Sequence, residues 1–167
     1  MAAEDSNISE DLFHANDEVI AGQKRINYDD YATVDPFSPV YEVPVSDQLF
    51  VIQSKIIQRL AANGPCVIIG RCSNFILKDY PNVLRVFIHA DWNFRIEKAT
   101  EKLSMSTKEI EKFLTKDDRR KDEYYRRFTG QEWKDATQYD LCLDSSKLGY
   151  DKCIEEIENQ LNLLKKK

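Results

Sequence analysis

An arginine directly follows a glycine at Gly70-Arg71, where the apolar run of residues 66–69 ends. Glycine permits a tight turn at such a point. A guanidinium offers a planar, permanently charged fork that fits two phosphate oxygens. Gly70 and Arg71 are therefore a candidate phosphate site. A surface arginine that pairs with Asp79 or another acid explains the same residues equally well.

A second concentration of charge lies in residues 116–127, where Arg119 and Arg120 stand seven residues before Arg126 and Arg127. Residues seven apart share one face of a helix, so this face could close over a polyphosphate. A solvated helix whose arginines pair with neighbouring aspartates explains the pattern as well, and charge runs in general favour that explanation.

Other polar residues stand at the ends of further apolar runs. His89 could act as a base, but no nucleophile lies near it in the sequence, so a structural histidine is the better explanation. Ser145 and Ser146 lack the G-x-S-x-G pattern of hydrolases. We interpret the two serines as a turn that could contact a nucleotide.

The elements that must position these residues alternate between helix and strand from residue 47 onward. Such alternation predicts an α/β fold with parallel strands and right-handed crossovers, in which ligands bind beyond the carboxyl ends of the strands. Helices are expected over residues 46–63, 91–103 and 106–130 and around residues 154–164, and strands over residues 66–69, 83–90 and 139–143. A weaker helical pattern covers residues 9–20, before an irregular stretch.

The composition fits one compact domain without a membrane or nucleic-acid partner. The chain has 167 residues, of which 42% are hydrophobic, and this is enough for a substantial core. It contains no run resembling a membrane span or a signal peptide, so we expect a cytoplasmic protein. The net charge of −5 argues against broad binding to nucleic-acid phosphates. The four cysteines show no Cys-x-x-Cys spacing, and no metal site is expected.

Four motifs occur in a fixed order: CVIIGRC, then RVFIHA followed by Asp91 and Arg95, then KDDRRKDEYYRRFTGQEW, then YDLCLDSSKLG. In order and spacing, the chain resembles the cytidylate kinase-like branch of the P-loop nucleoside monophosphate kinases over about residues 47–160. The resemblance implies a three-layer, P-loop-kinase-like parallel sheet with helices on both faces. It also implies phosphoryl transfer from ATP, with Mg²⁺, to a nucleoside monophosphate such as CMP or dCMP.

The resemblance further implies roles for single residues. Gly70 and Arg71 would bind the phosphate of the acceptor monophosphate, and Arg95 would lie near the base of the donor nucleotide. Residues 106–130 would form a basic lid helix over the transferring phosphoryl group. The catalytic residues implied in that helix are Asp118, Arg119, Arg120 and Arg127.

Two positions depart from the family pattern. The turn is usually Gly-Arg-Asp, with an acid that helps to recognise the base, and here Cys72 takes the place of the acid. Specificity for cytosine is therefore not implied. The lid pattern has an arginine three residues after its aspartate, whereas Lys121 follows Asp118.

A larger departure is the missing glycine-rich loop. The five glycines are followed by Gln23, Pro65, Arg71, Gln131 and Tyr150. No Gly-Lys pair exists, so the G-x-x-x-x-G-K-[ST] loop that holds a nucleoside triphosphate is absent. Family members begin with a strand, this loop, a helix and a second strand. We therefore expect a domain over residues 1–167 that lacks its first βαβ unit, as if the chain had started late.

Two functions stay open on these grounds. One is a cytidylate kinase-like phosphotransferase that is inactive as given because the loop is absent. The other is a non-catalytic nucleotide-binding or interaction module, either a degenerate kinase or a subunit completed by a partner. In the resembled family the loop-bearing strand lies between the strands at residues 66–70 and 83–90. Its loss would leave unpaired edges, so we expect a homo-oligomer.

Overall fold

The computed structural model describes residues 45–164. These residues divide into two compact units, one formed by residues 45–77 and 120–133 and the other by residues 78–119 and 134–164. We call them the first and the second unit. Helix α7 (Thr107–Thr129) runs through both. The helical pattern expected over residues 9–20 lies outside the described residues.

The first unit is built on helix α4 (Val45–Asn63), which confirms the helix expected there. Gly64, with a φ of 145°, and Pro65 end it, because proline cannot continue a helix. Its apolar face packs against the last turns of α7. The ring of Phe50 stacks on that of Phe128, with centroids 4.1 Å apart and planes 9° apart, and Tyr124 packs against both rings.

A buried ion pair joins the same two helices. The Arg127 Nη2 atom donates to both carboxylate oxygens of Asp47, at 2.9 and 3.2 Å. The side chain of Asp47 is 0% exposed and that of Arg127 is 7% exposed. Each charge therefore needs the other, because an unpaired charge removed from water is costly.

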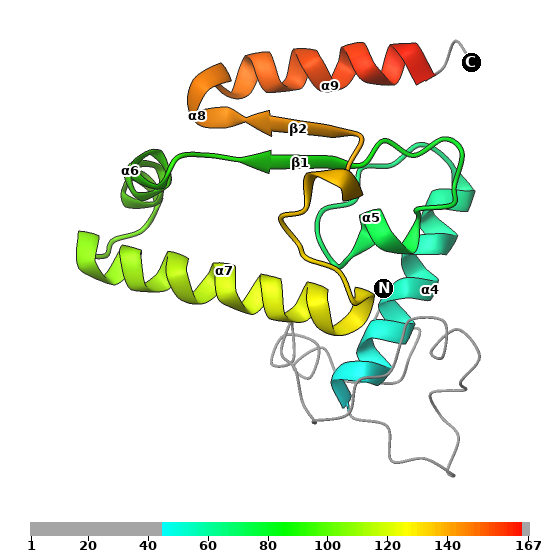
Figure 1. Cartoon of the computed structure of the whole chain (residues 1–167), viewed down its shortest axis with the longest axis horizontal. Coiled ribbons are helices and arrows are strands. Elements are labelled where there is room, and N and C mark those ends of the chain that lie inside the picture. The colour runs from blue at the N-terminus through cyan, green and yellow to red at the C-terminus, as the bar shows by residue number, and fades with distance from the viewer. Residues whose placement is uncertain (1–44, 165–167) are drawn as a thin grey trace. The chain divides into compact units, whose positions relative to one another are not determined.

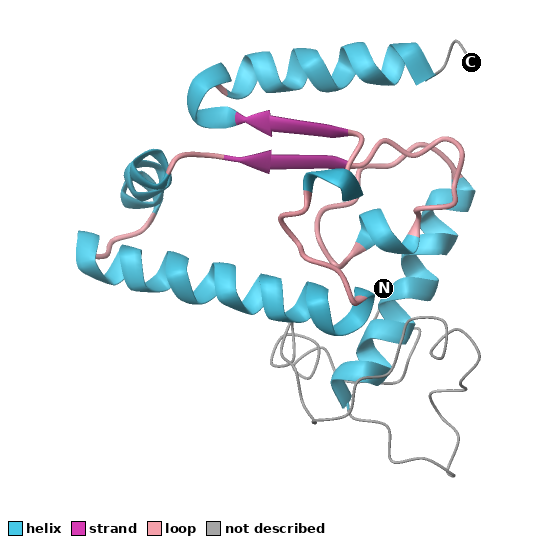
Figure 2. Ribbon diagram, viewed as in Figure 1, coloured by secondary structure: helices cyan, strands magenta, loops and turns pink. Residues whose placement is uncertain are grey.

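The strand expected over residues 66–69 is wrong. This segment is a loop between α4 and the short helix α5 (Ser73–Ile76), as Figure 2 shows. Val67 is 91% exposed and Ile69 90% exposed. An apolar run becomes a buried strand only when another strand pairs with it, and within residues 45–164 the sheet contains only two strands, both in the second unit.

That sheet is parallel, as expected. Strand β1 (Val86–His89) pairs with strand β2 (Leu141–Asp144), in a register from Val86 opposite Leu141 to His89 opposite Asp144. Strands β1 and β2 confirm the strands expected around residues 83–90 and 139–143, although each paired segment is shorter than the expected strand. The result is a mixed α/β structure that is mostly helical.

A bidentate ion pair fixes the register of the two strands. The guanidinium of Arg85 donates to Asp140 through Nε at 2.9 Å and through Nη2 at 2.6 Å, and the Arg85 backbone N–H donates to Asp140 at 2.9 Å. The ring of Phe87 lies 5.0 Å from that of Tyr139. These contacts hold the strands together just before the paired residues begin.

In this unit a helix lies along one edge of the sheet and another lies beyond the end of β1 (Figure 1). Helix α9 (Tyr150–Leu164) packs against β2, and the short helix α8 (Ser145–Leu148) connects the two. The remaining elements are helix α6 (Trp92–Lys102), which follows β1, and the 3-10 helix η1 (Ala136–Gln138), which precedes β2. Within residues 45–164, no helix combines the length and apolar character needed to cross a bilayer.

The buried ion pair predicts unequal roles for two neighbouring arginines. Replacing Arg127 by Met leaves the Asp47 charge buried alone and should lower the free energy of unfolding by about 3–5 kcal/mol. Arg126→Met removes an arginine that is half exposed and pairs with Asp122 and Glu132, so it should cost at most about 1 kcal/mol. Urea denaturation of both variants measures the difference, and equal losses would contradict this assignment. The double variant Asp47→Leu with Arg127→Met should recover much of the loss.

The exposed apolar segment leads to a second prediction. We propose that copies of the chain associate, because Val67, Ile69 and the half-exposed Ile88 on β1 present β-branched residues to water. Light scattering at micromolar concentration should give a mass above that of one chain. The double variant Val67→Lys with Ile69→Lys should lower this mass. A single-chain mass for the parent, with a cooperative thermal transition, would refute the proposal.

Candidate functional site

Three consecutive residues at the turn before α5 have left-handed backbone conformations. The φ angle is 73° at Gly70 and 56° at both Arg71 and Cys72. Glycine adopts this conformation freely, but a residue with a side chain pays about 1–2 kcal/mol. Backbone strain of this kind concentrates at functional sites. The turn is therefore a candidate site on the grounds of its geometry as well as its sequence.

Hydrogen bonds hold this turn in place. The Ser73 N–H donates to the Gly70 carbonyl at 3.0 Å, and the Phe75 and Ile76 N–H groups both donate to the Cys72 carbonyl at 2.9 Å. Asn74 on α5 donates to the Tyr125 hydroxyl on α7 at 2.8 Å. The turn is thus fixed to the last part of α7, within the first unit.

The guanidinium of Arg71 lies in a partly buried, positively charged setting. Burial is the main reason that the pKa of Arg71 lies below its usual value; Tyr124 raises it in part, and the positive charge of Arg120 lowers it again. An arginine stays protonated despite such a shift. The two cations therefore act on each other, and an anion bound at Arg71 would relieve their repulsion.

Cys72 follows Arg71, and its side chain is 5% exposed. This buried residue offers little surface to a ligand. The acid that the family pattern has here, and its contact with a base, have no counterpart in this turn.

Arg95 and Asp118 form a bidentate ion pair within the second unit. Nη1 and Nη2 of Arg95 donate to the two carboxylate oxygens at 2.8 and 2.6 Å. The hydrogen bonds that Arg95 donates to Asp118 raise the pKa of Arg95. Burial tends to raise the pKa of Asp118, but the hydrogen bond and charge of Arg95, aided by Lys134, outweigh it and hold that pKa below its usual value. Asp118 is positioned to orient Arg95, and a direct part for Asp118 in phosphoryl transfer stays a prediction.

The ends of the two strands are joined by serine hydroxyls. Ser145 donates to the His89 carbonyl at 3.0 Å. Ser146 donates to Asp144 through its backbone N–H at 3.1 Å and through its hydroxyl, and it accepts from the Asp91 N–H at 3.1 Å. The hydroxyl of Ser146 is the main cause that lowers the pKa of Asp144. These contacts agree with the interpretation of the serines as a turn.

A hollow of about 450 Å³ lies beside these strand ends. Its lining includes His89, Arg95 and Ser145, which the sequence singles out, together with aromatic and basic residues that were not predicted. The ring of Phe94 contacts that of Tyr150, with centroids 6.3 Å apart, and the amine of Lys98 lies 5.7 Å from the Phe94 ring. Phe94 and Lys98 lie four residues apart on the helix after β1, and this spacing is the signal that could have pointed to them.

The arginines predicted for the lid occupy different settings along α7. Arg119 is exposed in the second unit, and Arg120 is partly buried in the first unit, where its charge acts on Arg71. Arg127 belongs to the core through Asp47. Arg120 thus acts on Arg71 through its charge, and Arg127 has a stabilising role; the parts of both arginines in catalysis stay predictions.

Magnesium bound together with ATP stays a prediction, because Mg²⁺ is usually held by one or two carboxylates, water and the nucleotide phosphates. No group of three or more His, Cys, Asp or Glu side chains within residues 45–164 is arranged to hold a metal. The basic residues described above fit phosphate oxygens instead, because guanidinium groups bind such oxygens through charged hydrogen bonds.

Comparison with known proteins agrees with this picture. Residues 1–147 match the family described as cytidylate kinase-like. In fold, the chain is similar to the crystal structure of an uncharacterized protein from Eubacterium ventriosum, with a TM-score of 0.67 and 22% sequence identity over 82% of each chain. Among curated proteins, no sequence matches this chain.

Proposed function

Because the chain belongs to the cytidylate kinase-like family, we propose that it binds a nucleoside monophosphate, such as CMP or dCMP, at the turn formed by Gly70 and Arg71. Membership of the family supports a kinase-like role connected with nucleotides. The proposal adds the acceptor class and the place of binding. It also includes the three-layer parallel sheet of the family without its first βαβ unit, and a cytoplasmic location.

The observation that carries the proposal is the strained left-handed turn at Gly70, Arg71 and Cys72, which presents the Arg71 guanidinium at a fixed position. Both residues after Gly70 keep a left-handed backbone, and the charge of Arg120 acts on the Arg71 guanidinium. A phosphate monoester carries close to two negative charges at neutral pH. Two guanidinium groups can neutralise that charge and orient the phosphate through bidentate hydrogen bonds.

The other residues predicted for the site would neutralise phosphate charge or hold a nucleotide in position. ATP would supply the phosphoryl group in this chemistry, and the protein would contribute positioning and charge stabilisation. Arg120 would neutralise charge at the acceptor, and Arg119 would neutralise phosphate charge on the exposed face of α7. Arg95, held by Asp118, would offer a fixed cation near the base of the donor. Mg²⁺ would accompany the ATP phosphates, and no step is assigned to it.

A second candidate is a nucleotide-binding or interaction module without catalysis. The absence of a Gly-Lys pair from the sequence favours it, since the amides and the lysine of that loop hold the donor phosphates. The two candidates share the monophosphate site and differ only in turnover. They can therefore be separated by measuring binding and activity on the same protein.

The binding prediction concerns Arg71. Arg71→Ala removes a charged hydrogen-bonding group and should weaken binding of a nucleoside monophosphate by about 1.5–3 kcal/mol. Isothermal titration calorimetry with CMP and dCMP measures the change. Arg126→Ala is the matched control, because Arg126 is paired with Asp122 and Glu132, and it should bind like the parent.

Arg71→Gly separates the ligand contact from backbone strain. It should lose binding as Arg71→Ala does, but it should unfold with a free energy about 1 kcal/mol higher than that of Arg71→Ala, because glycine accepts the left-handed conformation. Equal affinity of the parent and Arg71→Ala for both nucleotides would remove Arg71 from the site.

The activity prediction is that this chain alone does not catalyse phosphoryl transfer. In a coupled assay with Mg-ATP and CMP, dCMP, UMP or AMP, product formation should equal the buffer background. Turnover that Arg71→Ala abolishes would establish the phosphotransferase and reject the non-catalytic module. Such a result would also show that the donor phosphates are held without a Gly-Lys loop.

A further inference from the structure

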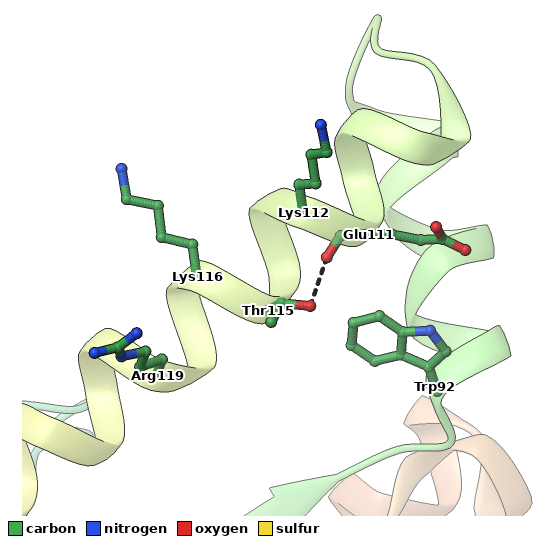
Figure 3. Close-up of a pocket in the computed structure, with 6 residues that line it drawn as sticks. All are labelled: Trp92, Glu111, Lys112, Thr115, Lys116 and Arg119. Carbon is green, nitrogen blue, oxygen red and sulfur yellow. Dashed lines mark hydrogen bonds between the residues drawn. The ribbon is translucent and has the colours of Figure 1, made fainter.

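A hollow of about 600 Å³ lies in the second unit between the start of α6 and the first half of α7 (Figure 3). Its walls combine one aromatic ring with three cations. The lining residues are Trp92, Glu111, Lys112, Thr115, Lys116 and Arg119.

Trp92 supplies an accessible flat surface whose surroundings are fixed. Its side chain is 40% exposed, and Figure 3 shows the indole extending from α6 toward Thr115 on α7. The guanidinium of Arg95 lies 5.5 Å from the centre of the ring, and Asp118 fixes Arg95 with two hydrogen bonds. An exposed tryptophan ring is a stacking surface for a nucleobase, because every base presents a flat π face.

The three cations of the hollow follow one another along α7. Lys112, Lys116 and Arg119 are separated by steps of four and three residues, so they share one face of the helix and extend over about 10 Å along its axis. Within the described part of the chain, neither lysine forms an ion pair. Glu111 contributes one negative charge to the hollow, and the cations therefore exceed it by two.

A row of exposed lysines on a helix is usually a solvated face. Here the row and an exposed aromatic ring line the same hollow. A ligand that satisfies the two surfaces together must carry a flat ring and several negative charges. A nucleoside di- or triphosphate has this chemistry, whereas inorganic phosphate lacks the ring and a nucleoside lacks the charge.

We propose that this hollow binds a nucleoside triphosphate, with the base on Trp92 and the phosphates along Lys112, Lys116 and Arg119. The inference rests on the proposed function, for which it names the site of the second nucleotide. It also explains how a chain without a Gly-Lys pair can bind a polyphosphate. The phosphates would meet side-chain cations instead of the backbone amides of a loop.

The chain offers a direct reporter of this site, because it contains only two tryptophans. The variant Trp133→Phe, made in the full chain, leaves Trp92 as the single fluorescent indole. Titration with ATP should then quench the Trp92 emission to saturation. Inorganic triphosphate should compete with ATP while causing little quenching itself, and adenosine should bind far more weakly than ATP.

Charge variants in the same background test the path of the phosphates. Lys112→Gln with Lys116→Gln should weaken ATP binding about tenfold, since each exposed charge contributes about a two- to fivefold effect. Lys108→Gln is the matched control, because Lys108 is an exposed lysine of the same helix outside the hollow, and its affinity should equal that of the parent. Glu111→Gln should tighten binding, because it removes the only carboxylate lining the hollow.

Calorimetry with ATP on the parent protein and on Trp92→Leu completes the test. The Trp92 variant should bind ATP about fivefold more weakly or worse. If ATP binds the parent but Trp92→Leu and the double lysine variant bind it equally well, this site is overturned while the monophosphate site stands. If neither ATP nor CMP binds the parent at millimolar concentration, both proposals fail. If inorganic triphosphate binds as tightly as ATP, the base adds nothing to affinity, and the stacking of the base on Trp92 is rejected.

Discussion

The buried ion pair between Asp47 and Arg127 is the constraint on which the first unit depends. A carboxylate that is 0% exposed on the first turn of α4 requires a cation, and only one rotation of α7 supplies it. The same rotation stacks Phe50 on Phe128. Arg120 lies seven residues before Arg127 and hence on the same side of α7, where its charge acts on Arg71. A stabilising contact in the core thus bears on which cation of α7 acts on Arg71.

Much of the fold could be predicted because its signals are local. The apolar spacing of α4 and the stop at Gly64 and Pro65 lie within one stretch of chain. The strands β1 and β2 are short, largely apolar runs, and β1 carries β-branched residues. The segment at residues 66–69 has an equally strong pattern, yet it is a loop. A strand requires hydrogen bonds from a neighbour, and no local pattern states whether that neighbour exists.

The candidate site was predicted in part for the same reason. Gly70 and Arg71 were expected at a turn, but the left-handed backbone of Arg71 and Cys72 depends on contacts that the sequence does not display. The seven-residue spacing placed the arginines of α7 on shared faces. It could not tell that Arg127 pairs with a residue 80 positions away, because such a partner is chosen by tertiary packing. Trp92 went unnoticed, since an aromatic residue at the start of a helix usually belongs to the core.

The left-handed turn at Gly70, Arg71 and Cys72 also affects how tightly a ligand can be held. A flexible arginine loses rotational and backbone freedom when it binds, and this loss subtracts from affinity. In this protein the backbone of Arg71 is ordered when the chain folds, by hydrogen bonds within the turn and by the contact of Asn74 with Tyr125. The backbone entropy of Arg71 is therefore lost when the chain folds, which lowers stability. It is not lost again when a ligand binds. Such preorganisation allows a single guanidinium to contribute more to affinity than the same group on a mobile loop.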